Sequence, residues 1–343
     1  MFQGGILVVA RTDAERGVLA ELKTRADANG VRADMLDEAG LKTVEPHASG
    51  IAALHAPEGA SFDSTAYVQT LLAEAAELGV SVRYGIRARD YTETAPEVSL
   101  TTSDGRMAAG ALVNCAGLQA DRLATGVADD MRVIPFRGYY AELVESARPL
   151  IRSHVYAAPD LAFPWLGVHL SHRADGRVIV GPGAMLAFGR EAYSFFGVNV
   201  RDLWDSLTWP GFRRLFRDRR FIDLTLSEVR KSLARRYIWK EAQLLVPALK
   251  RSDIVRSYAG NRAQLVSRDG KLVEDIVVRE TERAVHVLNA VSPGLTCSLP
   301  FGEEVARRAM VKLGKPSHPS LLPRFARDSG SGQASAPRTP HPL

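Results

Sequence analysis

The 343-residue chain lacks several features that would set it apart from ordinary globular proteins. Its two cysteines, Cys115 and Cys297, are too few for a disulfide framework and lack metal-site spacing, so we expect no bound metal. No run of about 18 apolar residues occurs, which argues against a membrane-spanning helix. The first residues, Met1–Gly5, carry no basic segment followed by an apolar stretch, so we expect no secretory signal. These absences favour a cytoplasmic location.

Acidic residues are slightly outnumbered, since 44 Lys and Arg stand against 39 Asp and Glu, a net charge of +5. This pattern predicts either a solvated helical face or an electropositive surface for an anionic substrate or membrane leaflet. No zinc-finger, RRM or KH pattern accompanies the charge, so we expect no nucleic-acid partner. Much of the excess lies in one stretch that holds Arg213, Arg214, Arg217, Arg219, Arg220, Arg230, Lys231, Arg235 and Arg236.

Hydrophobic periodicity and turn residues predict a mixed α/β protein. An α/β succession opens the chain, strand-like segments rich in aromatics follow from Arg132, and the α/β pattern returns near Val273. The Pro-, Ser- and Gly-rich residues from Lys315 onward are typical of disorder. The expected elements are strand 5–10, helix 12–28, helix 67–78, strands 80–84, 98–102, 111–115, 137–143, 154–157, 165–172 and 177–181, helices within 201–250, strand 284–288 and helix 301–313.

Eight short segments, each weak alone but distinctive in their order and spacing, carry a family resemblance. They are Glu45–His47, Val113–Arg122, Ile134–Gly138, Phe163–His169, Gly181–Phe188, Arg262–Gln264, Asp269–Asp275 and Leu288–Ala290. With them the chain resembles the L-2-hydroxyglutarate oxidase/dehydrogenase branch of the D-amino-acid-oxidase-like flavoproteins. The similarity runs from Gly5 to about Gly302.

The resemblance implies FAD as cofactor and an α/β (mixed α+β) fold, in which an antiparallel-sheet substrate domain is inserted into an incomplete FAD-binding Rossmann-like domain. We expect a substrate-domain segment at 1–60, a partial FAD-binding domain without its first βαβ unit at 61–130, and the substrate domain at 131–255. The C-terminal part of the FAD-binding domain follows at 256–314 and a disordered tail at 315–343.

The chain departs from the family in places that matter for the cofactor. The family opens with a Gly-x-Gly-x-x-Gly turn that holds the FAD pyrophosphate, and this pattern occurs nowhere in the chain. We therefore expect a misassigned start, a truncated gene, or a remnant that no longer binds FAD. Smaller departures at Glu58–Ser64, Gly260–Arg262 and Val291–Thr296 bear on the substrate and the flavin contacts.

Oxidation of a 2-hydroxy acid by a flavin requires a base for the hydroxyl proton and cations for the carboxylates. His169 is our candidate base, because it lies in an apolar strand and histidine titrates near neutral pH. A core histidine is the alternative. Arg137 and Arg262 are the candidate carboxylate ligands, since a guanidinium pairs with a carboxylate bidentately. A buried ion pair is the alternative for Arg137.

Tyrosines near these residues are candidate substrate ligands, and two glycine-containing segments are candidate flavin ligands. Tyr139 and Tyr156, with Tyr140 beside them, donate hydrogen bonds to substrate or line the core. Ala116 and Gly117 end a strand where small residues allow close approach of a cofactor, and a loop precedes the last helix. Ordinary turns are the alternative, and Cys297 is expected in the core. The loop residues are Ser292, Pro293, Gly294, Leu295 and Thr296.

The leading hypothesis is an FAD-dependent enzyme that oxidises L-2-hydroxyglutarate or a similar 2-hydroxy acid to the 2-oxo acid. Its electrons would pass to a quinone or to oxygen, and the basic helices could bring it to the periphery of a membrane. Two alternatives remain open. One keeps the flavin and oxidises an amino acid or amine, and the other is a non-catalytic remnant.

Overall fold

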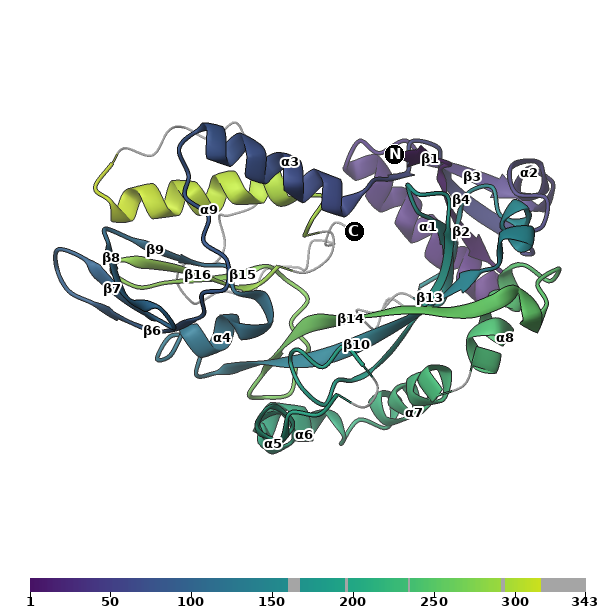
Figure 1. Ribbon diagram of the computed structural model, residues 1–343. Helices are drawn as coiled ribbons and strands as arrows, with labels where there is room; N and C mark the ends of the chain where they lie inside the picture. The colour runs from purple at the N-terminus through teal and green to yellow at the C-terminus, as the bar shows by residue number, and fades with distance from the viewer. Residues whose placement is uncertain (160–166, 195–196, 234, 291–293, 316–343) are drawn as a thin grey trace.

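The computed structural model describes residues 1–159, 167–194, 197–233, 235–290 and 294–315. The described chain forms two lobes connected by long central strands (Figure 1). We call the larger one the sheet lobe, built on an eight-stranded sheet, and the other the small-sheet lobe, built on two three-stranded sheets. Beyond Lys315 the predicted disordered tail lies outside the described residues.

The eight strands of the large sheet pair antiparallel, except that β11 and β2 run parallel. Strands close to the N-terminus therefore share a sheet with strands from the middle of the chain. In sheet order the strands are β14 (Ile254–Ser267), β10 (Met131–Leu143), β13 (Val178–Leu186), β12 (His169–His172), β11 (His154–Ala157), β2 (Ile6–Ala10), β4 (Ala52–Ala56) and β3 (Asp34–Asp37).

Helices cover both faces of this sheet. On one face Leu7, Val155, Leu170 and Val180 form a core with α8 and α2, because alternate strand residues point to the same side. The other face is covered at one end by α1, whose first turn is capped where Thr12 accepts a hydrogen bond from the Glu15 N–H at 3.2 Å. The helices of the lobe are α1 (Asp13–Ala28), α2 (Glu38–Val44), α5 (Val200–Thr208), α6 (Pro210–Leu215), α7 (Arg219–Leu233) and α8 (Arg235–Leu245), with short 3₁₀ turns η2 (Glu145–Leu150) and η3 (Arg251–Asp253).

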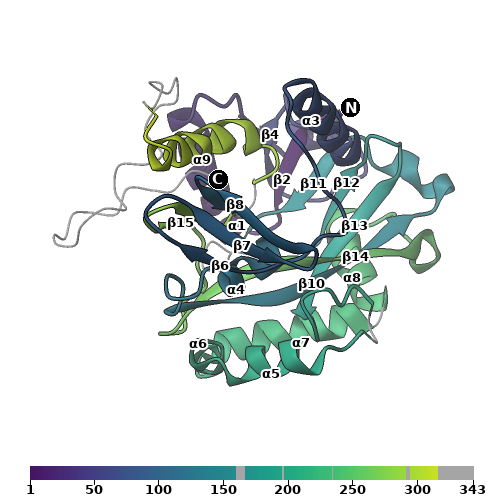
Figure 2. The same cartoon turned by 60° about the vertical axis from the view of Figure 1, so that its left-hand side comes forward.

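The small-sheet lobe carries α3 (Ser64–Glu77) and α9 (Ser298–Lys312) side by side above its sheets (Figures 1 and 2), joined where the Tyr67 hydroxyl and the Ser298 hydroxyl lie 2.8 Å apart. Strand β9 pairs parallel with β16. The other elements of this lobe are β15 (Val277–Glu280), β16 (Ala284–Asn289) and β9 (Leu112–Asn114) in one sheet, β6 (Ala88–Glu93), β7 (Val98–Thr102) and β8 (Gly105–Ala109) in the other, then η1 (Gly117–Gln119) and α4 (Ala120–Leu123). The short pair β1 (Phe2–Gln3) and β5 (Ala60–Ser61) lies at the sheet lobe, where Phe2 stacks on His172 of β12.

Most predicted elements are present, and the fold class is confirmed as mixed α/β. The predicted strand at 80–84 is wrong: among the described residues no strand pairs with this segment, and its Val80, Val82 and Tyr84 are exposed, so neither hydrogen bonds nor burial stabilise a strand. Strand β14 crosses the expected domain boundary at 255/256, because its residues pair with β10 from Met131 onward. Cys297 is exposed rather than in the core.

Candidate active site

Tyrosine and histidine side chains occupy the middle of the sheet face that is not covered by α8. Tyr156, His169 and Gly181 are paired across β11, β12 and β13, and they alternate with the core residues. They therefore point away from that core. The rings of Tyr156 and His169 stack with centroids 4.3 Å apart and planes at 15°. The predicted base and one predicted substrate ligand thus lie in direct contact.

The hydrogen bonds of His169 define its tautomer. Its Nδ1 lies 3.1 Å from the carbonyl oxygen of Gly167, which only accepts, so Nδ1 carries the proton and Nε2 the lone pair. Burial lowers the pKa of His169 to about 4, with a smaller contribution from His154, while the Gly167 bond opposes the shift. The ring is therefore neutral at neutral pH, the protonation state that a general base requires.

His169 and Tyr156 line a pocket of about 290 Å³ between the sheet and the segment that enters α3. Ser171 is on the same wall and donates a hydrogen bond to the Tyr156 hydroxyl at 3.3 Å. His154 and His172 complete this side, and burial lowers the pKa of His154 to about 4. His172 stacks on Phe2 with centroids 4.1 Å apart, which gives it a packing role. The lining residues include neither Arg137 nor Arg262.

Tyr140 extends this aromatic row across the sheet. A Cβ at Gly181 would lie 2.9 Å from the Tyr139 carbonyl and 3.2 Å from the Tyr140 ring, so a glycine is needed for this close approach. Tyr140 stacks on Tyr258 with centroids 5.0 Å apart. Burial raises the pKa of Tyr140 to about 12; Tyr258 and Tyr156 add to the shift and Arg262 opposes it. Sequence reasoning missed Tyr258.

Arg137 is fully buried, and its guanidinium donates hydrogen bonds to the carbonyls of Ala192, at 3.1 Å, and Ser194. It also lies over the rings of Tyr139 and Phe188, 5.0 and 5.9 Å from their centroids. Burial lowers the pKa of Arg137, and Tyr139 opposes the shift. Burial also lowers the pKa of Arg262, with Glu274 and Tyr140 acting in the other direction. A carboxylate-binding role for either arginine stays a prediction.

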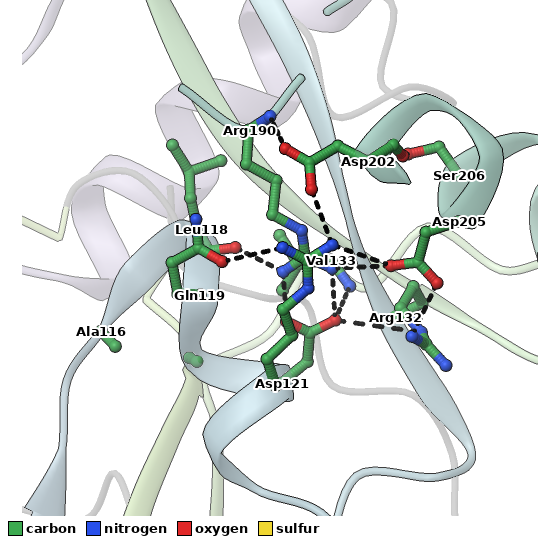
Figure 3. Close-up of polar contacts among 12 residues, drawn as sticks. Ala116, Leu118, Gln119, Asp121, Arg132, Val133, Arg190, Asp202, Asp205 and Ser206 are labelled. Atoms are coloured by element: carbon green, nitrogen blue, oxygen red, sulfur yellow. Dashed lines mark hydrogen bonds and ion pairs between the residues drawn. The ribbon is translucent and has the colours of Figure 1, made fainter. Parts of the chain in front are cut away.

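A buried ionic cluster fixes the loop against which Arg137 packs, and sequence reasoning missed it (Figure 3). Arg190, 1% exposed, pairs with Asp121 of α4 and with Asp205 of α5, at 3.3 Å for the latter. Asp202 of α5 accepts the Arg190 N–H at 2.9 Å. Burial lowers the pKa of Arg190, but its aspartate partners outweigh this and hold the pKa above its ordinary value. The loop is thereby held to α4 and α5.

The turn after β9 holds the first candidate flavin segment, Ala116 and Gly117, both of which are described residues. The Asn114 side chain accepts the Ala116 N–H at 3.1 Å and donates to His286 Nδ1 at 3.0 Å, and His286 Nε2 lies 2.9 Å from the Tyr91 hydroxyl. Gly117 has φ +52°, and a Cβ there would meet nothing within 4 Å. A left-handed glycine beside open space fits the close approach of a dinucleotide cofactor.

The second candidate flavin segment is described only in part. Ser292 and Pro293 lie outside the described residues, whereas Gly294, Leu295 and Thr296 lead directly into α9. The Leu295 carbonyl accepts the Ser298 N–H at 3.2 Å, a local turn at the start of the helix. These residues belong to the small-sheet lobe, whereas His169 and Tyr156 belong to the sheet lobe, so the two candidate sets come from different sheets.

Comparison with known proteins identifies the class as that of the flavin-dependent oxidoreductases. The FAD dependent oxidoreductase family model matches residues 1–308, so the chain belongs to that family. Among solved structures it is similar to an L-α-glycerophosphate oxidase from Mycoplasma pneumoniae with FAD bound. The TM-score is 0.69 at 21% identity, over 94% of this chain and 78% of the other. FAD is therefore the cofactor of its family.

Among curated proteins the chain is similar to L-2-hydroxyglutarate dehydrogenases from bacteria and animals. The protein from Indibacter alkaliphilus is 34% identical over 312 residues, which cover 89% of this chain and 77% of that protein. The mitochondrial one from Nematostella vectensis is also 34% identical, over 89% of this chain and 71% of its own length. The predicted resemblance is thus confirmed.

Proposed function

We propose that the chain oxidises L-2-hydroxyglutarate, or a closely similar 2-hydroxy acid, to the corresponding 2-oxo acid. The names of its relatives support this substrate class. The observation that carries the proposal is the state of His169: it is neutral, its Nδ1 proton is directed at Gly167, and its ring stacks on Tyr156 in a pocket.

Each candidate residue then has a defined part in the chemistry. His169 Nε2 takes the hydroxyl proton of the substrate, while bound FAD supplies the acceptor for the hydride. Tyr156 orients the acid by a hydrogen bond from the pocket wall. Tyr139, Arg137 and Arg262 lie outside the lining of this pocket, and we propose them as further ligands, Tyr139 by a hydrogen bond and the two arginines for the carboxylates. Ala116, Gly117 and the segment Ser292–Thr296 hold the cofactor, with the left-handed Gly117 allowing its close approach.

The proposal extends to domains and partners. It divides the chain into substrate-domain segments at 1–60 and 131–255 and FAD-binding segments at 61–130 and 256–314. A quinone or oxygen accepts the electrons, and the protein acts in the cytoplasm or at the periphery of a membrane. Within the described residues, each helix is too short or too polar to cross a bilayer.

The test mixes the full chain with FAD, removes unbound FAD by gel filtration and records the visible absorption of the protein fraction. We expect a flavin band that L-2-hydroxyglutarate bleaches without air. A band bleached by an amino acid instead would indicate the amine-oxidising alternative, and a protein that stays colourless would indicate a non-catalytic remnant.

A matched pair of variants tests His169. In His169→Gln, we expect flavin binding to persist and the rate of bleaching to fall about 10²- to 10⁴-fold, the usual contribution of a general base. His47→Gln, at an exposed histidine between α2 and β4, serves as the control and should bleach at the wild-type rate. Equal rates in both variants would contradict the role of His169.

A further inference from the structure

Helix α5 exposes its apolar residues and buries polar ones, the reverse of an ordinary surface helix. Val200, Trp204 and Leu207 recur at helical spacing, and they are 77%, 70% and 46% exposed. The residues that α5 buries are the polar Asp202 and Ser206. A helix on the surface of a globular protein normally directs such an apolar stripe inward. The outward stripe of Val200, Trp204 and Leu207, here called the α5 stripe, is therefore not packed against the described part of the chain.

The buried ionic cluster fixes this orientation. Asp202 pairs with Arg122 at 2.7 Å, and Asp205 pairs with Arg132 at 2.8 Å. Rotation of α5 to bury Trp204 would pull both aspartates away from their arginines and leave the buried Asp202 uncompensated. The α5 stripe is thus held at the surface by interactions that are costly to break, and its exposure is a property of the fold.

Basic residues lie in the same helical layer as the α5 stripe. Figures 1 and 2 show α5, α6 and α7 in one layer beneath β10 and β14, on the side away from α3 and α9. This layer exposes Phe216 together with arginines of the stretch noted in the sequence. The exposed arginines of the layer are Arg201, Arg213, Arg214, Arg217, Arg219 and Arg220, and Asp218 is an exposed acid among them.

We propose that the α5 stripe and its arginines dock the protein on the surface of an anionic lipid bilayer. Tryptophan favours the interface between headgroups and acyl chains, and arginines nearby attract anionic headgroups. A second copy of the chain fits this surface less well. A two-fold interface places the same patch on both sides, so that arginines would face arginines. The surface is separate from the candidate active site, so lipid binding and flavin chemistry are measurable independently.

The test measures flotation of the full chain with vesicles of phosphatidylcholine alone or mixed with phosphatidylglycerol. We expect binding to the mixed vesicles that weakens as salt is added. Trp204→Gln and Leu207→Gln should each lower the partition coefficient roughly tenfold, as expected for lost apolar burial. Arg217→Gln and Arg219→Gln should each lower it about fivefold. Leu78→Gln, at a leucine that is 85% exposed on the other lobe, should leave it unchanged.

Several results would overturn the proposal. These are equal binding to both vesicle types, absence of binding, or α5 variants that bind as tightly as Leu78→Gln. So would a concentration-dependent rise in mass that the α5 substitutions abolish, since the stripe would then join two copies. Thermal unfolding and FAD titration of each variant verify that the fold and the cofactor site are intact.

Discussion

The two lobes differ in how completely they bury their apolar residues. In the sheet lobe, Leu7, Leu170 and Val180 are inaccessible to solvent and belong to one large core. In the small-sheet lobe, α3 has no buried residue, and the cluster beneath α9 has Val285, Val287 and Val305 as its buried members. Because apolar burial is the dominant stabilising contribution, the sheet lobe should determine the global stability. The small-sheet lobe has more to gain from a bound cofactor.

The largest expected effect is the loss of Arg190. In Arg190→Met, Asp121 remains buried with the more distant Arg132, at 3.9 Å, as its cation, which should lower the free energy of unfolding by about 3–5 kcal/mol. Urea denaturation followed by circular dichroism measures this. A loss below about 1 kcal/mol would mean that the cluster is hydrated and does not brace the sheet lobe.

A leucine in each lobe tests the contrast in packing directly. Leu170→Ala leaves a cavity in the core and should cost about 2–5 kcal/mol. Leu78→Ala, at the exposed end of α3, should change stability by less than about 0.5 kcal/mol. The urea midpoints of the two variants measure these losses of stability. Similar losses in both variants would contradict the proposed difference in packing between the lobes.

Acidification should weaken the sheet lobe through its buried histidines. The folded-state pKa values of His154 and His169 are about 4, below the ordinary value of 6.5, so the unfolded chain binds more protons between these pH values. Stability is therefore lost as the pH falls through this window, by about 1–2 kcal/mol for each histidine at pH 5. Unfolding measured from pH 7 to 5 should show a flatter profile in His169→Phe. An unchanged slope would contradict the assignment.

A similarly small effect is expected at a surface ion pair of the small-sheet lobe. Arg83 lies 2.7 Å from Asp104, and both side chains are exposed. Arg83→Met should therefore change the free energy of unfolding by less than about 1 kcal/mol. It is the matched control for Arg190→Met, and a loss as large as in that variant would remove the distinction between the lobes.

Features fixed by local sequence could be predicted, whereas contacts between residues distant in the sequence could not. Helix α1 follows from the capping Thr12 and from Gly30, which takes φ +68° after the helix ends. The pairing of β10 with β14 joins residues more than a hundred positions apart, and its irregularity between Tyr139 and Ala141 changes which residues share a face. The stack of Tyr140 on Tyr258 depends on that irregularity, so alternation alone did not reveal it.

The candidate site shows the same limit. His169 and Tyr156 could be proposed from residue type and resemblance, but their stacking depends on the register of β11 with β12. Arg190 carried no signal in the sequence, because its partners Asp121 and Asp205 are distant along the chain and a buried cluster has no local pattern. The alternation of apolar residues at 80–84 led to a wrong strand prediction, because periodicity does not show whether a neighbouring strand is available for pairing.

The position of Arg190 has a mechanical consequence. Asp121 is four residues after Gly117 in the sequence, and Arg190 connects Asp121 to Asp205 (Figure 3). Asp205 directly follows the exposed Trp204 in the sequence. A surface that binds α5 is therefore connected to the Gly117 turn through the two ion pairs of Arg190. This linkage limits the directions that the cofactor turn can take relative to a surface bound at α5, while the site itself stays separate from that surface.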